Sequence, residues 1–297
     1  MKKKLLGGLA LALLLAGCGN SGSTDKEKTD DGKKTYKIGI IQQMEHPALD
    51  SAREGLEKYL KGKTDANFEI TVKNAQGDNG TADTIAKQFV SDDVDLIYSI
   101  ATNASQAAVN ATGGTDIPVV FNAVTDGVEA KLVTSNEKPG GNVTGVSDAA
   151  PLEKQVEMIR EFLPKAKKIG MIYNIGEVNG KLQVEQVEKL APKYGFTVVK
   201  KGISATTEVA TAAEQLSGDV DCIYNITDNM IVSATASITD KANAKKIPVF
   251  AAEDGQMKAG LLASDSISYE KLGEQAGSVV YDILVNGKKA GDIPVET

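Results

Sequence analysis

The chain has 297 residues, a formal net charge of −7, two cysteines and no tryptophan. This length suffices for two domains that each bury their own sheet. The negative charge and the scattered lysines argue against a nucleic-acid partner, because phosphate binding needs clustered Lys or Arg.

The first seventeen residues have the pattern of a secretion signal, in which three lysines precede the apolar run from Leu5 to Leu15. That run is too short to cross a bilayer as a stable helix. Its end, Leu15-Ala16-Gly17-Cys18, resembles the lipobox of bacterial lipoproteins, which implies lipid on Cys18. The alternative is an ordinary signal with a chance cysteine. Residues 18–35 are predicted to form a flexible tether, because 19–34 hold no apolar side chain.

From Tyr36 onward, apolar strand patterns alternate with helical patterns. In the first half we expect strands at 38–41, 68–72, 94–100 and 117–121, with helices at 47–60, 81–90 and from 103. In the second half we expect strands at 169–173, 196–200, 220–225, 247–250 and 260–263, with helices at 180–193, 207–216, 229–243 and 269–285. This alternation predicts an α/β fold with parallel sheets built from βαβ units.

The chain also contains an internal repeat. Asp-Val-Asp-Leu-Ile-Tyr-Ser-Ile at 93–100 returns as Asp-Val-Asp-Cys-Ile-Tyr-Asn-Ile at 219–226, and two further motifs recur (Lys37-Ile-Gly and Lys168-Ile-Gly; Ile117-Pro-Val and Ile247-Pro-Val). The offsets are 131, 126 and 130 residues, so we predict two Rossmann-like lobes. We expect lobe one to comprise residues 36–144 plus 266–297 and lobe two to comprise 145–265. A crossover would lie in the glycine-rich segment 139–147.

Ligands of open parallel sheets bind outside the carboxyl ends of the strands, so the loops there are the candidate site. In lobe one, Ala101 to Ser105 leads into a helix whose free N–H groups suit an anion. In lobe two the related loop carries Asp228, which suits an ammonium group but equally suits a helix cap. Glu253 is a second acid near the expected cleft. An anion site facing an acid predicts a zwitterion, that is, a free amino acid.

His46 is the only histidine, and no nucleophile motif, metal-spaced cluster or phosphate loop accompanies it. We therefore expect no enzyme activity, no metal and no cofactor. His46 would contact ligand across the cleft or cap the helix that begins at Pro47.

Four motifs in this order resemble the tryptophan/tyrosine-type substrate-binding proteins of ABC transporters: Glu45 to Asp50, Asn122 to Asp126, Pro139 to Gly145, and Thr227 to Asn229. The likeness runs from about Tyr36 to the end. It implies a type 1 periplasmic-binding-protein clamp, an aromatic ligand such as tryptophan, phenylalanine or tyrosine, and delivery to a membrane permease with an ATPase. The implied lipid anchor would hold the protein on the outer side of the cell membrane.

The family's ligand loops fall on a defined set of residues in this chain: Gln43, His46, Thr102, Asn103, Ala104, Ser105, Asn122, Asn174, Asn179, Asp228 and Asn229. The chain departs from the family pattern at Gly127, where a proline is common. Relatives also usually continue for a further strand and helix beyond Thr297. A branched-chain amino acid or a sugar is the alternative ligand, and a ligand-sensing receptor is the alternative role for the same fold.

Overall fold

The computed structural model describes residues 32–297, of which Lys34–Thr297 form one compact unit with two five-stranded sheets. The first sheet has the order β2-β1-β3-β4-β5, and all of its neighbouring strands are parallel. Its strands are β1 (Thr35–Gln42), β2 (Asn67–Asn74), β3 (Leu96–Ile100), β4 (Val119–Val124) and β5 (Val143–Ser147). The expected signal at 1–17, Cys18 and the tether as far as residue 31 lie outside the described residues.

The second sheet has the order β10-β9-β8-β6-β7 and is also parallel throughout. Its strands are β6 (Lys168–Asn174), β7 (Thr197–Ile203), β8 (Cys222–Asn225), β9 (Val249–Ala251) and β10 (Ala263–Ser264). Numbered within each sheet, both have the order 2-1-3-4-5. The sequence repeat is therefore a repeat of topology, and each sheet has a switch point beside its first strand, where ligands of such folds bind.

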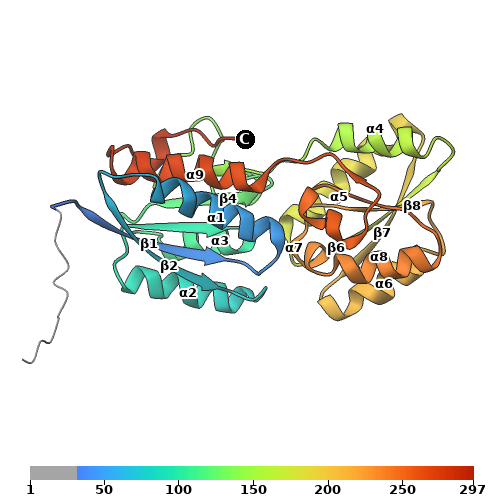
Figure 1. Ribbon diagram of the computed structural model, residues 1–297, viewed down its shortest axis with the longest axis horizontal. Helices are drawn as coiled ribbons and strands as arrows, with labels where there is room; N and C mark the ends of the chain where they lie inside the picture. Colours follow the sequence, from blue (N-terminus) through green and yellow to red (C-terminus); the bar gives the residue numbers. More distant parts are fainter. Residues whose placement is uncertain (1–31) are drawn as a thin grey trace, which may run out of the picture. The chain divides into compact units, whose positions relative to one another are not determined.

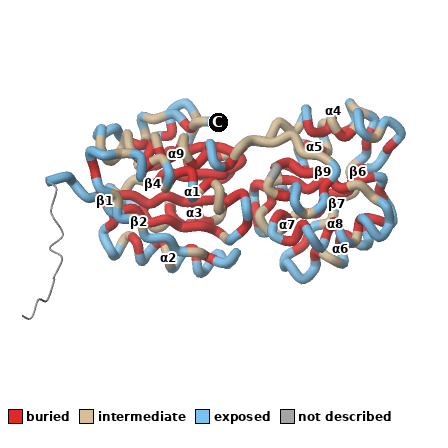
Figure 2. Tube along the Cα trace, viewed as in Figure 1, coloured by how far each residue is buried: buried red, intermediate tan, exposed pale blue. Residues whose placement is uncertain are grey.

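Helices cover both faces of each sheet (Figure 1). In the first lobe, α1 (Pro47–Lys61) and α9 (Tyr269–Leu284) cover one face, while α2 (Asn79–Ser91) and α3 (Thr102–Ala111) cover the other. In the second lobe, α4 (Leu152–Phe162) and α5 (Val178–Leu190) cover one face, while α6 (Val209–Leu216) and α8 (Thr235–Ala244) cover the other. Buried residues accordingly run along the strands of both sheets (Figure 2).

The repeated Asp-Val-Asp motif has a structural explanation in each lobe. Its second aspartate anchors the first strand of the sheet: the Asp95 carboxylate accepts a hydrogen bond from the Lys37 N–H at 2.7 Å. Asp221 accepts from the N–H groups of Lys167 and Lys168 at 2.7 and 2.8 Å. These bonds tie the third strand of each sheet to the start of the first strand, and they satisfy N–H groups at the strand start.

Helix α9 returns to the first lobe and lies directly against α1. A Cβ added at Gly273 would lie 2.1 Å from the Ala52 carbonyl oxygen, and one at Gly55 would lie 2.2 Å from the Glu270 carbonyl oxygen. Only glycine permits this separation of the two helix backbones. Because β5 continues to Ser147 in the first sheet, we propose that the first crossover follows Ser147, three residues later than the boundary expected from the sequence.

Besides shifts of one to three residues at the ends of other elements, three local expectations differ from the structure. The helix expected over 229–243 is divided into α7 (Asn229–Ser233) and α8, and the Thr235 hydroxyl at the break donates to the Val232 carbonyl at 2.8 Å. The last strand is the two-residue β10 rather than 260–263. Thr35, expected in the tether, is the first residue of β1. Among the described residues, no helix is both long and apolar enough to span a membrane.

Candidate functional site

A small, largely enclosed cavity lies where the carboxyl ends of the two sheets meet. The first lobe contributes His46, Ala48, Leu49, Ala123, Thr125 and Tyr269, the start of the crossover contributes Asp148, and the second lobe contributes Asn179, Thr227, Asp228, Asn229, Val232 and Glu253. The space open to the centre of a water molecule is only about 10 Å³, about enough for one water and far below the roughly 300–1,000 Å³ of small-ligand pockets. An amino acid therefore requires the lobes to separate for entry and to close again around it.

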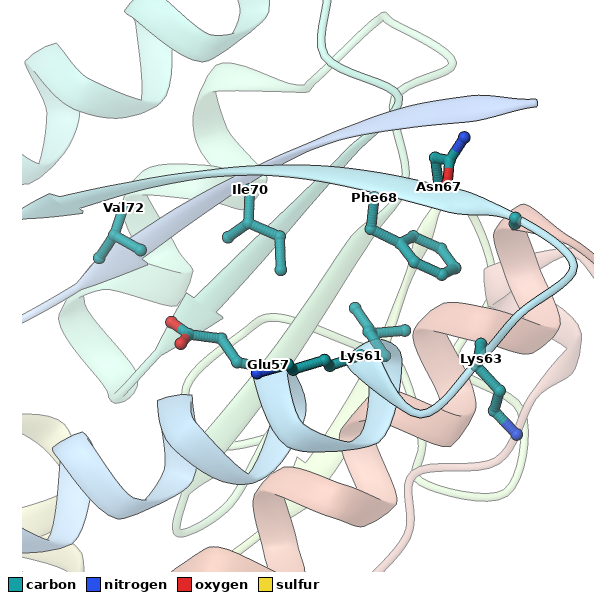
Figure 3. A pocket seen from close by; sticks show the side chains of 9 residues that line it. Glu57, Lys61, Lys63, Asn67, Phe68, Ile70 and Val72 are labelled. Atoms are coloured by element: carbon teal, nitrogen blue, oxygen red, sulfur yellow. The ribbon is translucent and has the colours of Figure 1, made fainter. Parts of the chain in front are cut away.

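A larger groove lies elsewhere, between α1 and the edge strand β2 (Figure 3). It is open to solvent and lined by Phe68, Ile70 and Val72 together with the charged side chains of Glu57 and Lys61. All of its lining comes from one lobe, and no lining residue has a buried polar side-chain atom without a partner among the described residues. Size alone therefore does not make it the ligand site.

Asp228 is fully buried at the start of α7 and acts first as a structural group. One carboxylate oxygen accepts from the Asn174 N–H at 2.7 Å, and the other accepts from the Ile231 N–H at 3.2 Å. Burial raises the pKa of Asp228, and the nearby Glu177 carboxylate raises it further. Asp228 thus caps α7 and joins it to the end of β6, so both of its oxygens are engaged before any ligand arrives.

Glu177, which the sequence analysis did not select, organises the second-lobe side of the cavity. It is 4 % exposed and accepts from the Nδ2 groups of Asn174 at 3.1 Å, Asn229 at 2.8 Å and Asn179 at 3.3 Å. Asn179 also donates to the Thr227 carbonyl at 2.9 Å. This network fixes which amide atom of Asn179 and Asn229 is the oxygen. The signal that could have revealed Glu177 is its place in the loop that follows β6.

His46 joins the two lobes. It is the N-cap residue of α1, its side chain is 6 % exposed, and its Nε2 lies 3.3 Å from the Asn229 Oδ1. Burial lowers the pKa of His46 to about 4, against the smaller opposite effects of Asn229 and Asp50. The ring is therefore neutral at physiological pH. It does not cap the helix through a side-chain hydrogen bond, which leaves contact with ligand as its remaining expected role.

Asp148 is the second residue that the sequence analysis missed. It follows β5 directly, is 3 % exposed, and accepts a hydrogen bond from the Tyr269 hydroxyl at 2.8 Å. Burial raises the pKa of Asp148 to about 6, against the smaller lowering effects of Tyr269 and Thr125. The rule that ligands meet the carboxyl ends of strands points to Asp148 once 143–147 is recognised as the fifth strand.

Glu253 lies at the end of β9, is 1 % exposed, and accepts from the Gly255 N–H at 2.8 Å. It lines the cavity, as do four other residues selected from the sequence: His46, Asn179, Asp228 and Asn229.

The remaining selected residues do not line the cavity: Gln43, Thr102, Asn103, Ala104, Ser105, Asn122 and Asn174. Asn122 is committed to the first lobe, because its Nδ2 donates to the Tyr98 hydroxyl at 2.6 Å and its Oδ1 accepts from the Ala123 N–H at 2.8 Å. Gln43 and Asn103 both donate to the Asn79 Oδ1, at 3.3 and 3.0 Å. The start of α3 therefore makes a polar cluster within the first lobe, and α1 supplies the helix N-terminus that lines the cavity, through Ala48 and Leu49.

The cavity is acidic. Of the described residues that line it, none is a lysine or an arginine, whereas three carry carboxylates: Asp148, Asp228 and Glu253. The described part of the chain also contains no cluster of His, Cys, Asp and Glu that could hold a metal ion. Such a cavity suits a small solute that carries its own positive charge.

Two parallel sheets of identical order, with a cavity between their carboxyl ends, form the two-lobed periplasmic-binding-protein type 1 fold. The expected fold class is thereby confirmed. Residues 37–297 match the family described as ABC transporter substrate binding protein, and the chain belongs to this family. It is therefore a binding protein that acts outside the cytoplasm and not an enzyme, as the sequence motifs predicted.

Three relatives give the detail. A tyrosine-binding protein of Clostridioides difficile (strain R20291) is 47 % identical over 300 residues, covering 99 % of this chain and 86 % of the relative. The ABC domain from Streptococcus pneumonia in complex with L-Trp is 36 % identical, with a TM-score of 0.85 and 89 % of each chain covered. A ligand-free, open substrate-binding protein with adhesive properties from Clostridium difficile is 46 % identical, with a TM-score of 0.66, covering 88 % of this chain and 89 % of that one.

The solved structure with the higher sequence identity to this chain has the lower TM-score. The open protein is closer in sequence, yet the tryptophan complex superposes better, with TM-scores of 0.66 and 0.85. A rigid rotation of one lobe lowers a whole-chain superposition without any change inside either lobe. The enclosed cavity and the His46–Asn229 contact are in keeping with the arrangement of the ligand-bound relative.

Proposed function

We propose that this protein captures one aromatic amino acid, namely tryptophan, tyrosine or phenylalanine, between its lobes and delivers it to an ABC permease with its ATPase. The observation that carries the proposal is the agreement of two relatives, one named for tyrosine and one solved with L-Trp, at 47 % and 36 % identity. The small enclosed cavity, with apolar Ala48, Leu49, Ala123 and Val232 beside its acids, supports it. Binding shifts the population towards the closed form, which is the form that a permease can distinguish.

The cavity gives less support to a sugar. Sugar clamps stack ligand on aromatic rings, and Tyr269 is the sole aromatic residue among the described residues that line the cavity. Its hydroxyl is already bonded to Asp148.

The test is a thermal-shift screen of the mature protein, stripped of ligand by unfolding and refolding, against the twenty amino acids and a panel of sugars. A ligand at one hundred times its Kd stabilises the folded state by about 2.7 kcal/mol. For a chain of this size that is a rise in Tm of roughly 5–10 °C. We expect this rise with one or more aromatic amino acids. A rise only with leucine, isoleucine and valine, or only with a sugar, would contradict the proposal.

The proposal includes a lipid anchor at Cys18 that holds the protein at the outer face of the cell membrane. Its support is the Leu15-Ala16-Gly17-Cys18 motif followed by the polar segment 19–34. A Cys18→Ser variant should move from the membrane fraction to the soluble fraction or medium, while its amino-acid affinity stays unchanged. Retention of the variant on membranes would contradict the anchor.

A further inference from the structure

Three side chains that line the cavity each have one buried polar atom without a hydrogen-bond partner among the described residues. These atoms are the His46 Nδ1, the Asp148 Oδ1 and the Asn179 Oδ1. Their side chains are 6 %, 3 % and 5 % exposed. A buried polar atom without a partner costs roughly 1–3 kcal/mol, so three around one cavity call for a ligand group that satisfies them.

All three atoms are hydrogen-bond acceptors. Glu177 holds the Asn229 Nδ2 at 2.8 Å, so the Asn229 Oδ1 faces the His46 ring, 3.3 Å from Nε2. Because that oxygen can only accept, the ring hydrogen is on Nε2, and Nδ1 of the neutral ring keeps its lone pair. The amide nitrogen of Asn179 is likewise held by Thr227, at 2.9 Å, which leaves its oxygen free to accept. The Asp148 Oδ1 accepts whenever the carboxylate is charged.

The missing partner must therefore supply several donors, and it must also bring positive charge into an acidic cavity. Asp228 has less need of such a donor, because each of its oxygens already accepts from a backbone N–H group of the second lobe. An ammonium group has three donors and one positive charge, and it matches both requirements. A water molecule or a hydroxyl supplies at most two donors and no charge.

We propose that the α-ammonium group of the bound amino acid is held by Asp148, Asn179 and His46. This inference rests on the proposed function, because it assigns one group of that ligand to one part of the same cavity. His46 lies in the first lobe and Asn179 in the second, while Asp148 begins the crossover, where its N–H donates to the Val124 carbonyl of the first lobe at 3.2 Å. The ammonium group therefore bonds to residues of both lobes. Tight binding then requires a free amine, whatever the side chain of the ligand. Asp148 is a specificity-determining residue in this scheme, and Tyr269 positions it.

The test compares ligands with and without the amine. Isothermal titration of the mature protein would use L-tyrosine and 3-(4-hydroxyphenyl)propanoate, which lacks only the amine, or the matching pair for whichever aromatic amino acid binds. We expect the amine-free compound to bind at least about 100-fold more weakly to the wild type, because buried acceptors then stay unpartnered. In Asp148→Asn the preference for the amine should shrink at least about tenfold. Asp240→Asn makes the same change on the exposed surface of α8, and it should leave the preference unchanged.

A second measurement needs no variant. Burial raises the pKa of Asp148 to about 6, so the free protein takes up a proton there in mildly acidic solution and must release it when the ammonium binds. Between pH 7.5 and pH 5.5 the affinity for the amino acid should fall about fourfold, while that for the amine-free compound should not. The other titratable groups facing this part of the cavity are His46, Asp228, Glu253 and, through Asp148, Tyr269. The pKa of His46, about 4, keeps the ring neutral over this range.

The outcomes are distinguishable. If the wild type binds an aromatic amino acid but Asp148→Asn keeps the same preference for the amine, the inference is overturned and the proposed function stands. Equal affinities of the wild type for the two compounds would also overturn the inference alone. If no amino acid binds, both fail. Should Asp148→Asn not fold, the pH profile decides, and an affinity for the amino acid that is constant from pH 7.5 to 5.5 overturns the inference.

Discussion

The Asp228→Ala variant tests whether Asp228 supports the second lobe or holds the ligand. The substitution removes both acceptors of a fully buried carboxylate and leaves the N–H groups of Asn174 and Ile231 without their partner. Each such group costs roughly 1–3 kcal/mol. Part of this cost is offset, because the variant no longer buries a carboxylate beside Glu177, whose charge helps to raise the pKa of Asp228. The loss of the two hydrogen bonds outweighs the gain from removing the buried carboxylate, since two donors lose their partner. We therefore expect the free energy of unfolding to fall by about 2–4 kcal/mol.

The assay is urea and thermal unfolding of the ligand-free protein followed by circular dichroism. A loss of this size lowers the Tm by roughly 5–15 °C. Asp240→Ala on the exposed face of α8 is the matched control and should unfold like the wild type. An Asp228→Ala protein with wild-type stability but no affinity for amino acids would refute the reasoning, because Asp228 would then hold the ligand's ammonium group as the sequence suggested.

Three further predictions concern stability and titration. The pKa of Asp148 is about 6 in the folded protein against an ordinary value of 3.8, so the folded state binds this proton more tightly and its stability falls as the pH rises from about 4 to about 6. Asp148→Asn should therefore stabilise the ligand-free protein at pH 7 by up to about 3 kcal/mol and by little at pH 4; equal effects at both pH values in urea unfolding would contradict this. Gly273→Ala places a Cβ 2.1 Å from the Ala52 carbonyl oxygen and should cost about 1–3 kcal/mol in urea unfolding, whereas Gly218→Ala, with its nearest contact at 3.4 Å, should be close to neutral. The ring of His46, the only histidine, should remain neutral from pH 8 to pH 5, because burial lowers its pKa to about 4, and its hydrogen should lie on Nε2, which faces the Asn229 Oδ1; in ¹H–¹⁵N NMR of the ring, a titration midpoint above pH 6 would contradict the lowered pKa, and a hydrogen on Nδ1 would contradict the tautomer assignment.

The sequence by itself determined the two-sheet architecture, because the signals for it are local. Most strands contain a contiguous apolar run, the strand at 68–72 alternates, the helices have periodic patterns, and the repeat at about 130 residues predicts that both halves fold alike. The repeated Asp95 and Asp221 belong to these local signals, since each accepts a hydrogen bond from a backbone N–H at the start of the first strand of its sheet. The same patterns located the carboxyl-end loops, and with them five of the residues that line the cavity.

Only the tertiary structure decided which polar residues of those loops face the cavity. Asn122 lies within β4 and is bonded within its lobe, whereas Asp228 follows β8 and caps α7. Asp148 and Glu177 become prominent only when β5 and β6 place them at the cavity. The physical reason is that a side chain's role depends on which partners already occupy its hydrogen-bonding atoms. Those partners come from segments far apart in the chain, so no local pattern records them.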